Sequence, residues 1–69
     1  MEFRLDGEEF ITLQSLLKAG GLSESGGSAK FAITSGQVKV DNEIETRRGK
    51  KIRAGQTVTF EGRQITVIA

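Results

Sequence analysis

The sequence predicts a small α+β domain in which two short helices are followed by two β-hairpins. Apolar residues recur with helical spacing as far as about residue 35, and from Gln37 onward they alternate with polar residues as in strands. The chain has 69 residues, which we interpret as a single domain over residues 1–69. At this length a hydrophobic core is near the lower limit at which it stabilises a fold without disulfides or metals.

The N-terminal part of the chain predicts a short strand and then a helix. Phe3 and Leu5 alternate with charged residues ahead of Asp6-Gly7, a dipeptide typical of turns. Thr12 is the predicted N-cap of the helix, because a threonine hydroxyl can accept a hydrogen bond from an N–H group of the first turn. The apolar positions of this helix fall at i, i+3 and i+4, namely at Leu13, Leu16 and Leu17. Gly20-Gly21 predicts its end.

A second helix is expected to run to about Ser35. Ser23 or Ser25 can cap its N-terminus, and Gly36 is the glycine that would end it. Its buried stripe is predicted to consist of Ala29, Ala32 and Ile33. Phe31 flanks this stripe.

The first hairpin follows, and its register depends on the length of its turn. A two-residue turn that paired Val40 with Glu43 would put Ile44 on the face opposite to Val38 and Val40. A three-residue connection would keep all three apolar residues on the core side, and we therefore expect the longer connection. Asn42 is expected near the left-handed conformation, which asparagine tolerates better than most residues.

The last hairpin is predicted to have a two-residue turn at Glu61-Gly62. Only a turn that pairs Phe60 with Arg63 places all the apolar residues of the hairpin on one face, and these are Val58, Phe60, Ile65 and Val67. Residues 47–53 lie between the two hairpins and are called the basic segment below. We expect this segment to be a loop or a fraying strand held out from the sheet.

The basic segment carries five cations in seven positions, although the formal net charge of the chain is only +1. Its cations are Arg47, Arg48, Lys50, Lys51 and Arg53. Cations that served only solubility would be interspersed with acidic residues over the surface. Clustered cations repel one another, and a polyanion would relieve that repulsion. The pattern therefore predicts contacts with phosphates, with an ordinary solvated loop as the alternative interpretation.

The composition excludes most catalytic and metal-binding chemistry. The chain has no cysteine and no histidine, so zinc sites built on thiolate or imidazole, cysteine nucleophiles and Ser-His relays are absent. Its carboxylates and lysines form no recognisable acid–base pair. We predict a protein that is not an enzyme and has no cofactor, metal or small-molecule substrate. No apolar run approaches the ~20 residues of a membrane span and no signal peptide is recognisable, so we expect a cytoplasmic protein without membrane contact.

A helix-then-hairpin signature is formed by Ser25, Ala29-Lys30, Ile33, Gly36 and Val38-Lys39-Val40-Asp41-Asn42. This signature resembles the RNA-binding domain that is named after small-subunit ribosomal protein four. With Glu45-Thr46-Arg47 and Ala54-Gly55-Gln56-Thr57-Val58 added, nearly the whole chain is similar to the stand-alone bacterial YbcJ type of this family, which consists of little besides this domain. The resemblance implies the αL motif, with two helices packed on a small antiparallel sheet of about four to five strands.

The resemblance also implies that structured RNA binds along the second helix and the adjoining hairpin. The predicted RNA-binding residues are Lys30, Lys39, Arg47, Arg48, Lys50, Lys51 and Arg53. Larger members of the family usually carry an arginine just after the serine that aligns with Ser25, whereas Gly26 stands there in this chain. The basic segment could supply the missing charge from the loop side.

We therefore expect a non-catalytic protein that binds structured RNA through backbone phosphates, with ribosomal RNA as a candidate by family analogy. Proteins that hold single strands usually offer exposed rings on which bases stack. The chain has no tyrosine or tryptophan, and most of its phenylalanines fall at positions assigned to the core, the four being Phe3, Phe10, Phe31 and Phe60. Base stacking is therefore not expected. The alternative function is a protein-interaction module whose basic segment docks an acidic protein partner.

Overall fold

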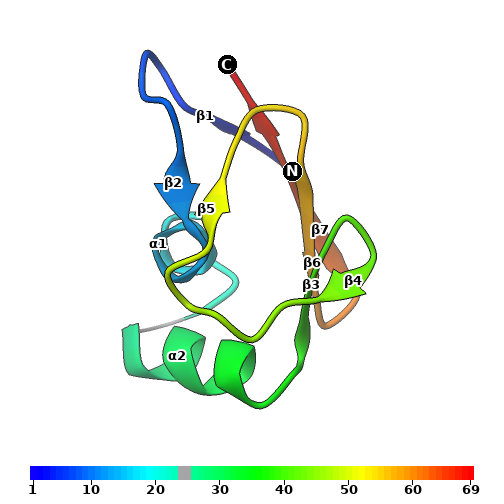
Figure 1. Cartoon of the computed structure of the whole chain (residues 1–69). Coiled ribbons are helices and arrows are strands. Elements are labelled where there is room, and N and C mark those ends of the chain that lie inside the picture. Colours follow the sequence, from blue (N-terminus) through cyan, green and yellow to red (C-terminus); the bar gives the residue numbers. More distant parts are fainter. Residues whose placement is uncertain (24–25) are drawn as a thin grey trace.

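The computed structural model describes residues 1–23 and 26–69, in which two helices lie on one side of a five-stranded sheet (Figure 1). The strands of this sheet follow the order β1 (Glu2–Arg4), β7 (Arg63–Ile68), β6 (Thr57–Phe60), β3 (Val38–Val40) and β4 (Glu43–Ile44). Strand β1 pairs with β7 in parallel, whereas the other neighbours are antiparallel. The predicted α+β architecture is confirmed, with one parallel pair added at the edge.

The two helices, α1 (Leu13–Ala19) and α2 (Gly26–Thr34), pack on the sheet through one apolar core. The side chains with no exposed surface come from every layer, and they include Leu13, Leu16, Leu17, Ile33, Val38, Ile52, Val58, Ile65 and Val67. Within the described ranges no polar or charged side chain is buried. All the charged groups there lie at the surface. Neither of the helices in these ranges is long and apolar enough to cross a membrane.

The ends of α1 follow the sequence prediction. The Thr12 hydroxyl oxygen accepts a hydrogen bond from the Ser15 N–H group at 3.4 Å, and Thr12 is the N-cap of α1. The chain leaves α1 through Gly21, whose φ of 74° a glycine adopts without strain. Helix α2 begins at Gly26, so Ser23 lies too far ahead to be its N-cap, and the cap predicted at Ser25 lies outside the described residues.

The first hairpin differs from the prediction, because its turn has two residues and not three. Val40 pairs with Glu43, and Ile44 pairs with Lys39. Ile44 therefore faces away from the core and is 62% exposed. The prediction of Ile44 as a core residue was wrong.

The physical reason lies in the turn itself. Asp41 and Asn42 both have positive φ, 50° and 72°, which is the conformation of the tight turn that best matches the twist of paired strands. The Asp41 carboxylate also accepts a hydrogen bond from the Thr57 N–H group at 3.0 Å, which fastens the turn to β6. The left-handed conformation expected for Asn42 is confirmed.

The last hairpin has the predicted register, in which Phe60 pairs with Arg63 across the turn. Glu61 and Gly62 form this turn with φ values of 51° and 76°. Because the register is correct, Val58 and Ile65 pair on the buried face of the sheet.

Candidate nucleic-acid interface

The basic segment is anchored to the rest of the domain. Lys51 and Ile52 form strand β5 (Lys51–Ile52), which pairs with β2 (Ile11–Thr12) in a second sheet of two strands. Ile52 has no exposed surface and belongs to the core. The segment lies outside the five-stranded sheet and residues 47–50 form a loop, both as expected, but Lys51 and Ile52 form a paired strand and not a fraying one. The reason is Ile52, an apolar residue between two cations that is buried against residues far away in the sequence.

The backbone of the basic segment also satisfies the N-terminus of α1. The first N–H groups of a helix have no partner within the helix. Here the Leu13 N–H group donates to the Lys50 carbonyl oxygen at 2.8 Å, and the Gln14 N–H group donates to the Arg48 carbonyl oxygen at 3.1 Å. A further hydrogen bond, from the Lys50 N–H group to the Arg47 carbonyl oxygen at 3.1 Å, closes a turn within the segment. The backbone is therefore held by α1, while the Arg48 side chain is exposed.

Two cations of the segment lie over the ring of Phe10. The Lys51 Nζ atom is 5.0 Å and the Arg53 Cζ atom 5.6 Å from the ring centroid. The alternation of a strand puts these two side chains on one side of β5 and Ile52 on the other. Each such contact stabilises an exposed cation by ~0.5–1 kcal/mol. Phe10 is half-buried, and its ring supports the two cations.

Arg47 is held by a carboxylate two residues away. Its Nε atom donates to Glu45 Oε2 at 3.1 Å, and its Nη2 atom donates to Glu45 Oε1 at 3.2 Å. These hydrogen bonds from the guanidinium hold the pKa of the Glu45 carboxyl below its ordinary value. A lowered pKa means that the ion pair is intact at neutral pH and is lost only as the pH falls through that value. One cation of the segment is therefore partly neutralised within the molecule.

Replacing Glu45 with glutamine is expected to strengthen RNA binding at pH 7, because it releases Arg47 for a phosphate. One added phosphate contact should make the slope of log K against log salt steeper by ~0.7–0.9. The matched control is Glu43→Gln, which removes the same charge from a residue without an ion pair in the described ranges. Equal effects of the two variants in a fluorescence-anisotropy titration would contradict a specific role of the Glu45–Arg47 pair.

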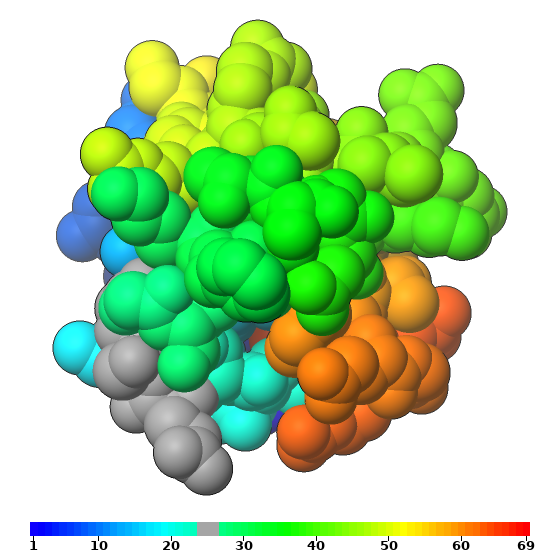
Figure 2. All heavy atoms as spheres, turned by 90° about the horizontal axis from the view of Figure 1, so that it is seen from below, coloured from blue at the N-terminus to red at the C-terminus, as the bar shows by residue number. Residues whose placement is uncertain are grey.

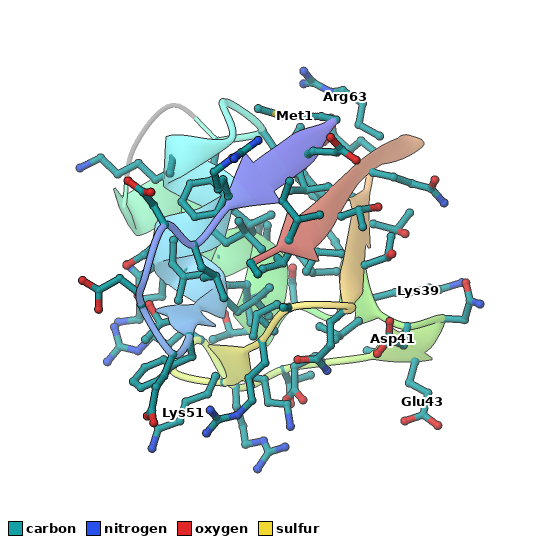
Figure 3. All side chains as sticks on the ribbon, turned by 90° about the horizontal axis from the view of Figure 1, so that it is seen from above. Met1, Lys39, Asp41, Glu43, Lys51 and Arg63 are labelled. Atoms are coloured by element: carbon teal, nitrogen blue, oxygen red, sulfur yellow. The ribbon has the colours of Figure 1, made fainter. Side chains whose placement is uncertain are left out.

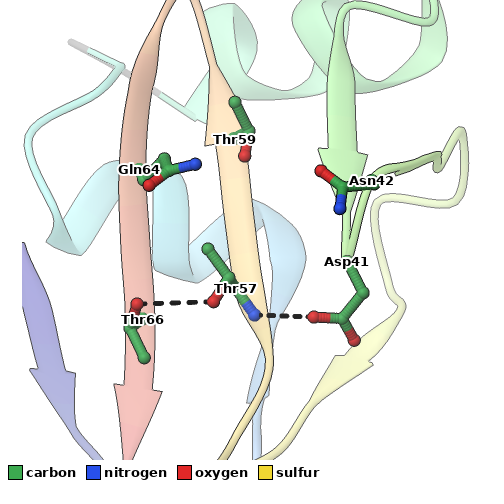
Figure 4. Close-up of a pocket in the computed structure, with 6 residues that line it drawn as sticks. All are labelled: Asp41, Asn42, Thr57, Thr59, Gln64 and Thr66. Atoms are coloured by element: carbon green, nitrogen blue, oxygen red, sulfur yellow. Dashed lines mark hydrogen bonds between the residues drawn. The ribbon is translucent and has the colours of Figure 1, made fainter.

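Two hollows on the described surface are of opposite character. One, of about 520 Å³, is lined by Arg47, Gly49, Lys50, Lys51 and Arg53. The other, of about 300 Å³, lies on the outer face of the sheet and is lined by Asp41, Asn42, Thr57, Thr59, Gln64 and Thr66 (Figure 4). Its one charged group is a carboxylate, which repels phosphate. The first hollow, which contains four of the five cations of the basic segment, is the one that suits a polyanion.

The other two predicted residues, Lys30 and Lys39, differ in their position relative to the basic segment. Lys30 is exposed on α2, and Figure 2 shows the surface of α2 adjoining that of residues 45–51. Lys39 is on β3, where its pairing with Thr59 places it on the outer face of the sheet. Lys39 and Lys51 point to different sides of the molecule (Figure 3). The structure thus brings α2 next to the basic segment and leaves Lys39 apart from both.

Phe31 was missed by the sequence analysis as a surface residue. It is 67% exposed, although it was expected to flank the buried stripe of α2. The buried stripe of α2 is Ala29, Ala32 and Ile33, as predicted. At about 100° per residue, Phe31 falls nearly opposite to the centre of this stripe. That angle was available from the sequence and would have identified Phe31 as exposed.

Comparisons with known proteins agree on the family and the fold. A family model described as S4 domain matches residues 3–68. The chain is 52% identical over 67 residues to "Putative RNA-binding protein YbcJ" of Escherichia coli (strain K12), covering 97% of this chain and 96% of that protein. It is 41% identical over 54 residues to "Probable ribosome maturation protein RlbA" of Bacillus subtilis (strain 168), covering 78% of this chain and 76% of that protein.

A solved structure matches the fold of the described residues. The solution structure of YbcJ from E. coli, reported to reveal an αL motif involved in RNA binding, matches with a TM-score of 0.77. The two chains are 51% identical, and the match covers 99% of this chain and 86% of that one. The predicted αL motif is confirmed by this match.

Proposed function

Because the chain belongs to the S4 domain family, we propose that it is a non-catalytic RNA-binding protein whose basic segment contacts the backbone phosphates of structured RNA. One relative supports the choice of ligand. YbcJ of E. coli bears the name of an RNA-binding protein, and its αL motif is described as involved in RNA binding. The same motif is present here at 51% identity.

The observation that carries the proposal is the anchoring of the basic segment. Its backbone is hydrogen-bonded to α1, and Ile52 is buried in the core. The cations are consequently presented on a fixed backbone, so that little conformational freedom is lost when phosphates bind. Lys30 adds a cation on the adjoining helix. A solvated loop that served no ligand would not need this anchoring.

The RNA that we propose is folded, and ribosomal RNA is the first candidate. A-form helices are recognised mainly by shape and by contacts with phosphates and 2′-hydroxyls, for which a fixed basic hollow is suited. The B. subtilis relative is named as a ribosome maturation protein. A role in assembly or quality control of the ribosome would follow from the same interaction.

The test is a titration of a labelled ribosomal RNA hairpin across a series from 50 to 200 mM salt. An unstructured RNA of equal length and a DNA hairpin of the same sequence serve as matched competitors. We expect the RNA hairpin to bind most tightly, with log K falling linearly as log salt rises. Weak binding to all three nucleic acids, with no salt dependence, would contradict the proposal and favour docking of an acidic protein partner.

A further inference from the structure

The exposure of Phe31 is not explained by the fold. Its side chain is 67% exposed on the face of α2 opposite to the core stripe. Phenylalanine is also a poorer helix former than the lysine, glutamate or alanine that usually occupies such positions. Neither packing nor helix propensity therefore accounts for an aromatic ring at this place.

Phe31 lies on the helix whose surface adjoins the proposed RNA site. Lys30 is the preceding residue on α2, and the surface of α2 adjoins that of the basic segment (Figure 2). No acidic residue lies in the first turn of α2. An exposed apolar ring on a helix beside a cationic surface matches a nucleotide, which combines a flat apolar base with a negatively charged phosphate.

The other phenylalanines of the chain do not offer an open ring. Phe60 is buried, and Phe3 packs against the core. Phe10 is already in contact with Lys51 and Arg53. Among the described residues, Phe31 is the aromatic ring that remains accessible to a nucleobase.

We propose that Phe31 is the stacking site for one unpaired nucleobase of the bound RNA. The ligand class is then a folded RNA in which an unpaired nucleotide, such as a bulge, lies next to a helix. The helix phosphates bind the basic segment, and the unpaired base stacks on Phe31. This inference rests on the proposed RNA-binding function and narrows its ligand.

The experiment uses three RNA hairpins that differ at one position: a single-nucleotide bulge, the same bulge without its base, and no bulge. Each is titrated against the wild-type protein and the Phe31→Ala, Phe31→Leu and Phe31→Trp variants. For the bulged hairpin we expect Phe31→Ala to weaken binding by roughly 5- to 150-fold, the range measured for one stacked base. Phe31→Trp should restore binding, and Phe31→Leu should not. The salt slope should be the same for all four proteins, because the ring carries no charge.

The hairpin without the base separates stacking from a structural role. If Phe31 stacks on the base, the wild type prefers the bulged hairpin over the abasic one, and Phe31→Ala loses that preference. Equal losses on all three hairpins, or no loss on any, would overturn the inference while leaving the basic segment as the RNA site. If the wild-type protein shows no salt-dependent binding to any of the three hairpins, the proposed function itself is refuted. Unchanged RNA binding together with loss of a defined protein complex would assign Phe31 to a protein interface.

Discussion

Changing Arg47, Arg48, Lys50 and Lys51 together to alanine is expected to remove most of the affinity for a ribosomal RNA hairpin. Arg47 is paired with Glu45, so three phosphate contacts are lost, and the slope of log K against log salt should become shallower by ~2.1–2.7, at ~0.7–0.9 for each contact. Between 50 and 200 mM salt, that difference corresponds to roughly 20- to 40-fold in affinity. The fold should persist, because Ile52 and the backbone hydrogen bonds of the segment are retained. Anisotropy titrations across the salt series measure both quantities.

A second variant controls for the overall charge. The four substitutions lower the formal net charge from +1 to −3. Arg4→Ala, Lys18→Ala and Arg63→Ala in one chain lower it to −2 without touching the basic segment. We expect this control to keep a salt slope close to that of the wild type. If both variants lost the slope equally, the attraction would come from the net charge of the molecule and not from the basic segment.

The helices and the last hairpin could be predicted from the sequence because their signals are local. A cap, a spacing of three and four residues, and a glycine are all close together in α1, and each is where it was expected. The turn at Glu61-Gly62 was likewise determined by the parity of its flanking residues. Ile44 shows the limit of parity, which assumes that every apolar residue of a hairpin faces the core. At the short edge strand β4, the tight turn at Asp41 and Asn42 determined the register instead.

The candidate site was predicted only in part, for a related reason. The cluster of cations is visible in the sequence, but its anchoring is not, since it depends on contacts between residues 10–14 and residues 48–53. No local pattern connects segments that are more than thirty residues apart. The contacts of Phe10 could not be predicted for the same reason, because its partners Lys51 and Arg53 are brought to it by the pairing of β2 with β5.

Replacing Ile52 with alanine is expected to have the largest effect on stability of any change in the basic segment. Ile52 has no exposed surface, and a buried Ile→Ala substitution typically costs ~2–5 kcal/mol of unfolding free energy. The total free energy of unfolding of a 69-residue domain is ~3–10 kcal/mol. Ile52→Ala would therefore remove a large share of the stability. The midpoint of thermal unfolding should fall by about 10–30 °C. A midpoint within a few degrees of the wild type would mean that β5 is not packed into the core.

Two milder substitutions, Ile52→Val and Ile65→Val, test whether Ile52 also holds the cations of the basic segment in place. Both residues are fully buried, and each change should cost ~0.5–1.5 kcal/mol, so both proteins stay folded. The Leu13 and Gln14 N–H groups report on the segment, since they donate to the carbonyl oxygens of Lys50 and Arg48. In Ile52→Val, hydrogen exchange at these two groups should accelerate more than exchange in β6 and β7. Ile65 lies on β7, so in Ile65→Val exchange in β6 and β7 should accelerate more than exchange at Leu13 and Gln14. Equal acceleration in both variants would show that the basic segment opens only when the whole domain unfolds, and that Ile52 contributes to overall stability alone.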